Sequence, residues 1–108
     1  MGLFAVSRYR ILVLKDDETD EEGAIGYDRP MRSFFFQGFV NQDPEDDRPE
    51  IWLGNILDEY PTLETLLNEV KRRGYKIGAL EHSAIIEMMR EAGEKPVPSL
   101  AERLGLMI

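Results

Sequence analysis

The chain has 108 residues, 43% of them hydrophobic, no cysteine and a formal net charge of −8. This length and composition predict one folded domain over residues 1–108 and exclude a disordered chain, and without cysteine neither disulfides nor thiolate metal sites can form. No apolar run reaches the roughly 20 residues that cross a bilayer, and the first ten residues lack a signal-peptide pattern, so we expect a cytoplasmic protein without a membrane partner.

The negative charge is concentrated in the first half of the chain. Residues 1–59 contain 14 acidic and six basic residues, whereas residues 60–108 contain seven of each. Direct binding of nucleic acid requires a basic face, which this distribution does not offer. The acidic half instead favours a basic protein partner or an imitation of nucleic-acid charge, and solubility is the simpler alternative.

The first predicted strand covers residues 9–15, where apolar side chains occupy both faces and indicate an interior position in a sheet. Residues 16–23 follow, and six of these eight are acidic. Because like charges repel, we interpret this run as an exposed hairpin loop that ends at Gly23. A calcium-binding loop of the EF-hand type is the more specific alternative. The positions of that loop that require glycine and glutamate hold Glu21 and Tyr27 instead.

Further strands are predicted over residues 24–27, 32–40 and 50–54, which are bounded by turn-forming residues. Such strands in series form an antiparallel meander. The turn at residues 41–49 is polar, contains two prolines and carries a second acidic cluster.

The strand at 32–40 carries four phenylalanines that cannot all face the same side of a sheet. Phe34 and Phe36 share one face, and Phe35 and Phe39 share the other unless a bulge at Gly38 separates them. Helices are expected to cover one face. The second face is covered either within the domain or by a partner.

The clearest helix follows Thr62, a good N-cap, and ends at Gly74, which suits the left-handed position after a helix. Leucine and valine recur between them at the helical spacing of three and four residues. Residues 75–77 predict a short strand or an extended link, and a second helix is predicted over residues 81–92. The fold class is therefore α+β: an antiparallel β-meander of three to four strands packed against two helices, with a short C-terminal helix at residues 99–104.

Catalytic chemistry has little support in the sequence. His82 is the single histidine and is adjacent to Ser83, but sequence neighbours on a helix point about 100° apart and no orienting acid or oxyanion hole is recognisable. The glycines match no phosphate-binding loop. We predict no catalytic residue, no metal ligand and no cofactor. The basic residues at 71–73 suit the C-terminal end of a helix dipole.

Three short segments follow one another in a characteristic order: the acidic turn at residues 20–27, the threonine-capped helix at 62–70 and the Gly-Glu-x-x-Pro-x-Pro-Ser-like run at 92–99. In this order they resemble the HicB-type antitoxins. They cover under a third of the chain, and the hairpin from Phe34 to Trp52 has no counterpart in that family's pattern. The resemblance implies a regulator that neutralises a small toxic partner.

We therefore predict a non-enzymatic protein-binding or inhibitory module that acts through an acidic face. The alternatives are an antitoxin-like regulator and a small enzyme that uses clustered carboxylates with a divalent metal, and a homodimer is compatible with each. The predicted partner-binding residues are the two acidic clusters and the two phenylalanines of the second face: Asp16, Asp17, Glu18, Asp20, Glu21, Glu22, Phe35, Phe39, Asp46 and Asp47.

Overall fold

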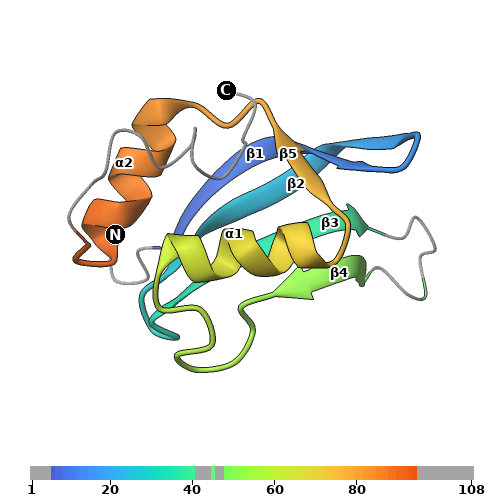
Figure 1. Ribbon diagram of the computed structural model, residues 1–108. Helices are drawn as coiled ribbons and strands as arrows, with labels where there is room; N and C mark the ends of the chain where they lie inside the picture. The colour runs from blue at the N-terminus through green and yellow to red at the C-terminus, as the bar shows by residue number, and fades with distance from the viewer. Residues whose placement is uncertain (1–5, 41–44, 46–47, 95–108) are drawn as a thin grey trace.

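The computed structural model describes residues 6–40, 45 and 48–94, which form five strands and two helices (Figure 1). The elements in chain order are β1 (Val6–Lys15), β2 (Glu18–Asp28), β3 (Ser33–Val40), β4 (Pro49–Leu53), α1 (Leu63–Arg72), β5 (Lys76–Gly78) and α2 (His82–Glu91). The predicted α+β class is confirmed, and the C-terminal helix expected at 99–104 lies outside the described residues. Neither described helix has the length and apolar character needed to cross a membrane.

The five strands form one antiparallel sheet in the order β4-β3-β2-β1-β5. The first four strands are the predicted meander. After α1 the chain returns to the other side of β1, where β5 pairs with residues 12–14. This fifth strand corresponds to the segment predicted as a short strand or an extended link, and it makes this part of β1 interior to the sheet, as the sequence predicted.

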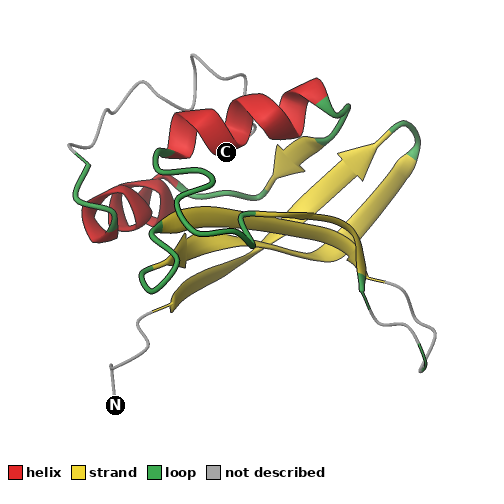
Figure 2. Cartoon of the chain, turned by 90° about the horizontal axis from the view of Figure 1, so that it is seen from below, coloured by secondary structure: helices red, strands yellow, loops and turns green. Residues whose placement is uncertain are grey.

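Both helices lie on the same face of the sheet, and no other described element covers the opposite face (Figure 2). The apolar stripe predicted for α1 is buried, and Thr62 caps that helix by accepting a hydrogen bond from the Thr65 N–H. The side chain of Glu94, after α2, accepts a hydrogen bond from the Leu63 N–H at 3.1 Å and so joins the end of α2 to the start of α1. Phe34 and Phe36 lie fully buried beneath the helices.

The acidic run after β1 is mainly a strand, so its prediction as a hairpin loop is wrong. Lys15 pairs directly with Glu18, which leaves only Asp16 and Asp17 in the turn. The exposed carboxylates repel one another only weakly because water and salt screen their charges. The hydrogen bonds of the β1–β2 ladder therefore prevail, and a register shift opposite Leu12 accommodates one extra residue in β2.

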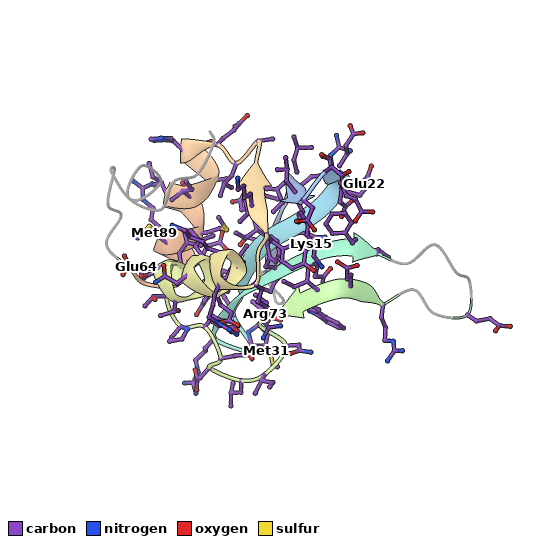
Figure 3. The ribbon with its side chains drawn as sticks, turned by 45° about the vertical axis from the view of Figure 1, so that its right-hand side comes forward. Lys15, Glu22, Met31, Glu64, Arg73 and Met89 are labelled. Carbon is purple, nitrogen blue, oxygen red and sulfur yellow. The ribbon has the colours of Figure 1, made fainter. Side chains whose placement is uncertain are left out.

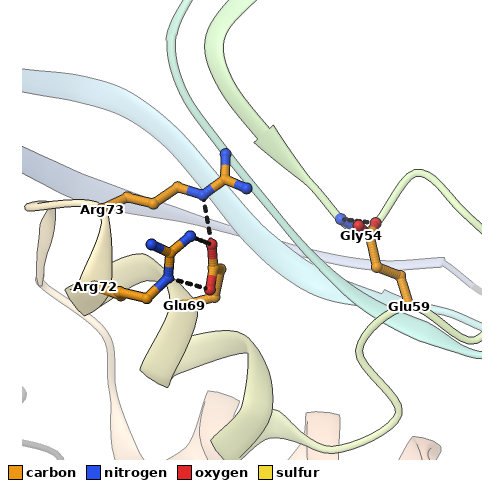
Figure 4. Close-up of polar contacts among 5 residues, drawn as sticks. All are labelled: Gly54, Glu59, Glu69, Arg72 and Arg73. Carbon is orange, nitrogen blue, oxygen red and sulfur yellow. Dashed lines mark hydrogen bonds and ion pairs between the residues drawn. The ribbon is translucent and has the colours of Figure 1, made fainter.

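The loop at residues 54–60 is held to the sheet by several hydrogen bonds. The Gly54 N–H donates to the Glu59 side chain at 3.1 Å (Figure 4), and the Asp58 N–H donates to the Met31 carbonyl at 2.8 Å. Asp58 also pairs with Arg32 at 3.2 Å. This connection is therefore an ordered part of the domain, although the sequence predicted it only as a link.

Ser33 joins this loop to the core. Its side chain is fully buried, donates a hydrogen bond to the Phe34 carbonyl at 2.9 Å and accepts one from the Tyr60 N–H at 2.9 Å. A buried backbone N–H that loses its acceptor costs free energy because water cannot replace the lost partner.

We expect Ser33→Ala to lower the free energy of unfolding by about 1–3 kcal/mol, because the partly buried Tyr60 N–H would lose its acceptor. Ser83→Ala removes the same atom from an exposed helix position and is expected to change stability by less than about 0.5 kcal/mol. Urea denaturation of both variants measures the difference. Equal losses would contradict the role assigned to Ser33.

Candidate functional site: an acidic hairpin end

The β1–β2 hairpin projects beyond the helices and carries most of the predicted site (Figure 1). Six of the ten predicted partner-binding residues lie on it. Five of these are exposed and one is half-buried: Asp16, Asp17, Glu18, Glu21 and Glu22 are exposed, and Asp20 is half-buried. The end of β3 and the start of β4 lie at the same end of the sheet (Figure 1). Asp46 and Asp47, between those strands, lie outside the described residues.

The carboxylates of the hairpin end outnumber the two basic side chains beside them, Arg10 and Lys15. Within the described part of the chain, Arg10 and Glu22 form the one ion pair that involves these six acids, at 3.8 Å, and both side chains are 75% exposed. Glu22 points outward from the hairpin (Figure 3). An exposed pair of this length contributes little stability. The side chains of four exposed acids form no hydrogen bond or ion pair with another described residue: Asp16, Asp17, Glu18 and Glu21.

Asp20 differs from its neighbours because its carboxylate binds the backbone. One oxygen accepts a hydrogen bond from the Phe39 N–H at 2.6 Å, and the other accepts one from the Glu22 N–H at 2.9 Å. Bonds of this kind to a charged acceptor are stronger than those to a neutral one. The structure therefore gives Asp20 a role in joining the hairpin to the end of β3.

Phe39 adopts a left-handed backbone conformation with φ of 55°. Regular alternation would place its ring with Phe35, but the ring instead packs beside Tyr75 on the helical side, with centroids 6.1 Å apart. The pairing of Gly38 with Ile51 continues in register with that of β3 and β4 on either side, so no bulge causes the change. A bulky residue in this conformation is strained, and the hydrogen bond to Asp20 helps to hold it.

Phe35 is buried on the face that lacks helices. Its side chain lies across Gly26 on β2, and the guanidinium carbon of Arg8 lies 5.9 Å from the ring centre. Only 6% of Phe35 is exposed. The ring therefore offers little surface to a partner in this conformation.

In the part of the chain that the structure describes, the large exposed hydrophobic side chains lie elsewhere, and the predicted site does not include them. Those of the described residues belong to the β3–β4 hairpin or to the loop that follows it: Val40, Trp52, Ile56 and Leu57. In the sequence, Trp52 alternates with the apolar residues Ile51 and Leu53, and this alternation was the one signal that Trp52 faces away from the core. Nothing in the sequence distinguishes the exposed aliphatic pair in the loop from core residues.

Three polar side chains, Lys15, Glu50 and Tyr75, contact one another on the helical face of the sheet, near the acidic hairpin end. The Tyr75 hydroxyl donates to Glu50 at 2.7 Å, and the Lys15 ammonium lies 3.4 Å from the same carboxylate oxygen. The hydrogen bond from Tyr75 lowers the pKa of Glu50, and the one between Tyr75 and Lys15 raises the pKa of Lys15. Burial raises the pKa of Tyr75. All three groups therefore keep their ordinary charge at neutral pH, which suits a structural tie between strands rather than acid–base catalysis.

Over residues 6–40, 45 and 48–94, no group of three or more histidine, cysteine or acidic side chains is arranged to hold a metal ion. His82 begins α2 and is exposed, and neither it nor Ser83 caps that helix.

The basic residues at the end of α1 are partly neutralised. The Glu69 carboxylate accepts hydrogen bonds from the Nε of Arg72 at 2.9 Å and from the Nε of Arg73 at 2.6 Å (Figure 4). These bonds, together with the arginine charges, lower the pKa of Glu69 from 4.5 to about 2. The cluster is accounted for by contacts within one helix and offers less positive charge to a nucleic acid than the sequence suggests.

The chain matches no protein-family model, and no curated protein or solved structure matches it. The function must therefore be inferred from the residues and their geometry.

We expect Asp20→Ala to lower the free energy of unfolding by about 1–3 kcal/mol, because two backbone N–H groups lose a charged acceptor. Asp17→Ala removes the same charge from an exposed position in the hairpin turn, where the side chain forms no hydrogen bond with another described residue, and should change stability by less than about 0.5 kcal/mol. Thermal or urea denaturation at one pH compares the variants. A similar effect of both substitutions would show that Asp20 has no special role.

The lowered pKa of Glu69 predicts a loss of stability in acid. The folded protein holds this carboxylate ionised, so its contribution is fully present above pH 4.5 and is lost as the pH falls toward about 2. Glu69→Gln should therefore unfold with a weaker dependence on pH between these values than the wild type. Urea denaturation at several pH values measures this dependence, and an unchanged dependence in the variant would contradict the role of Glu69.

Proposed function

We propose that this protein is a non-enzymatic binding module that recognises a basic surface on a protein partner through its acidic hairpin end. The observation that carries the proposal is a set of four exposed carboxylates at the end of a projecting two-stranded hairpin, which form no hydrogen bond or ion pair with other described residues: Asp16, Asp17, Glu18 and Glu21. We include a cytoplasmic location and an inhibitory or regulatory role in the same proposal.

A rigid support for these charges favours binding. The ladder between β1 and β2 extends to the pair Lys15 and Glu18, so paired strands reach the two-residue turn on both sides. Preorganised groups lose less conformational entropy on binding than groups on a flexible loop. The charges also accelerate encounter with a cationic surface through long-range attraction.

The chemistry of this end defines the partner class. A row of carboxylates is complementary to lysine and arginine side chains, and proteins that bind nucleic acid present such side chains in clusters. A partner that normally binds a phosphate backbone could therefore bind the hairpin end in its place. By occupying the nucleic-acid-binding surface of the partner, the carboxylates would inhibit the binding of nucleic acid to that partner.

The wild-type protein is immobilised on a resin and incubated with a lysate of its source cells. Each captured protein is then purified by itself, and its affinity for the wild-type protein is measured by titration. Neutralising Asp16, Asp17 and Glu18 together (D16N/D17N/E18Q) should weaken the affinity at least tenfold. The dependence of affinity on salt should become shallower, because fewer screened charge pairs form. Heparin should compete with the wild type.

The matched control neutralises three carboxylates on the helices, away from the hairpin (E64Q/E87Q/E91Q). It changes the net charge by the same amount and should alter affinity less than twofold. The proposal is wrong if no basic protein is captured, or if the captured partner binds the two triple variants equally well.

A further inference from the structure

One edge of β1 is only partly covered by a neighbouring strand. β1 has ten residues, and β5 pairs with residues 12–14 alone. The Tyr27 N–H donates a hydrogen bond to the Ser7 side chain at 3.0 Å, so these two paired residues turn their backbone groups toward each other. Since backbone groups alternate along a strand, the N–H and C=O groups of Arg8 and Arg10 point to the free side. Among the residues that the structure describes, none forms a hydrogen bond with them.

A groove runs beside this free edge. Two adjoining hollows of about 280 and 270 Å³ share Arg10 and Ala79. The groove forms because the chain leaves β1 after β5, where Ala79 has φ of 59°, and then leads into α2 (Figure 1). Half-buried Tyr9 and Ala84 of α2 belong to the apolar part of the lining. An additional strand in this groove would continue the line of β5.

The charges that line the groove nearly cancel. Arg8 donates a hydrogen bond to the Gln37 side chain at 3.3 Å and lies over the Phe35 ring. Arg10 pairs with Glu22 at 3.8 Å. The two arginines share the lining with three acidic residues: Glu21, Glu22 and Glu81. The groove therefore favours an uncharged segment over an acidic or a basic one.

A second copy of this chain fits the free edge poorly. When two β1 strands pair about a two-fold axis centred on residue 8, 9 or 10, an arginine of one copy lies opposite an arginine of the other: Arg8 or Arg10 in each case. Like charges directly opposite each other destabilise an antiparallel pair. The edge is thus better suited to a different, uncharged segment.

The chain itself contains an uncharged segment that starts near this groove. Residues 95–108 follow the described part of the chain, and residues 105–108 read Gly-Leu-Met-Ile. Burial raises the pKa of Tyr9, and the nearby carboxylates of Glu91 and Glu87 raise it further. The end of α2 therefore lies near the same edge of β1, only a few positions before residue 95.

The connection from α2 is long enough to reach the groove. α2 has ten residues and is therefore about 15 Å long. Residues 95–98 span about 13 Å when extended, and the helix predicted over residues 99–104 adds about 9 Å. This connection also tethers residues 105–108 to the domain, which raises their effective concentration at the groove above that of a free partner.

We propose that residues 105–108 bind beside residues 8–11 of β1 in the same molecule, as a sixth strand of the sheet. The segment pairs with the free N–H and C=O groups of Arg8 and Arg10, as in other cases of strand addition. A covered edge protects a sheet from pairing with other chains. This inference does not depend on the function proposed for the acidic hairpin end.

The side chains of such a strand alternate between the two faces of the sheet. Leu106 and Ile108 then lie on the helical face, beside half-buried Tyr9. Met107 lies on the open face, where no described element covers the sheet. Substitutions at Leu106 and Met107 are therefore expected to differ in effect.

Amide hydrogen exchange, measured by NMR on the ¹⁵N-labelled protein, compares the full chain with a shortened chain that ends at Leu104. The amides of Arg8 and Arg10 should exchange at least tenfold faster in the shortened chain. The amides of Tyr9 and Ile11 face β2 and should change less than twofold, so they report whether β1 itself is retained. Unchanged exchange at Arg8 and Arg10, or equal acceleration at all four residues, would overturn the proposal.

Two variants of the full chain test the placement of the segment. Leu106→Asp puts a charge on the helical face and should accelerate exchange at Arg8 and Arg10 at least tenfold. Met107→Asp adds the same charge on the open face and should accelerate it less than threefold. Thermal denaturation verifies that both variants are folded, and equal effects of the two substitutions would contradict the assigned faces.

A spin label distinguishes binding within one molecule from binding between copies. The chain has no cysteine, so Ala101→Cys provides a single attachment site. The label should broaden the amide signals of residues 8–11 in its own molecule. In an equimolar mixture of spin-labelled ¹⁴N protein and unlabelled ¹⁵N protein, these signals should stay sharp. Broadening in the mixture would assign the groove to a second copy, and no broadening in either sample would leave the segment elsewhere; each result overturns the proposal.

Discussion

The antiparallel pairing of β1 with β2 is the interaction on which the rest of the structure depends. β1 lies between β2 and β5, so it connects the meander to the segment that follows α1. Its residues Ile11 and Val13 are almost completely buried under the helices. The same ladder continues beyond the helices and carries the acidic residues of β2 into solvent. The burial of apolar side chains in the middle of β1 therefore stabilises the whole β1–β2 hairpin, including its acidic end, which contributes little to stability by itself.

The junction between the core and the acidic end is made by polar groups. Asp20 holds the backbone of Phe39, whose ring packs beside Tyr75 on the helical side. Tyr75 in turn donates its hydroxyl proton to Glu50. Strands β2, β3 and β4 thus meet the segment before β5 through a continuous set of contacts. Some carboxylates of this acidic protein are structural groups, whereas Asp16, Asp17, Glu18 and Glu21 lie beyond this junction and are exposed.

Charge is distributed unevenly over the domain. The hairpin turn is acidic, whereas the basic end of α1 is partly neutralised by Glu69. These two features lie on different elements of the domain.

The sequence by itself determined the fold class, the meander, both helices and the cap at Thr62, because these depend on local periodicity and local hydrogen bonds. It also identified the acidic residues that the hairpin gathers. Tertiary structure decided which of them are free: the role of Asp20 depends on Phe39, 19 positions away, and no local pattern encodes that contact. The burial of Phe35 and the position of β5 beside β1 were decided in the same way. Each results from long-range pairing, in which backbone hydrogen bonds and shared apolar burial outweigh local preferences such as the repulsion within an acidic run.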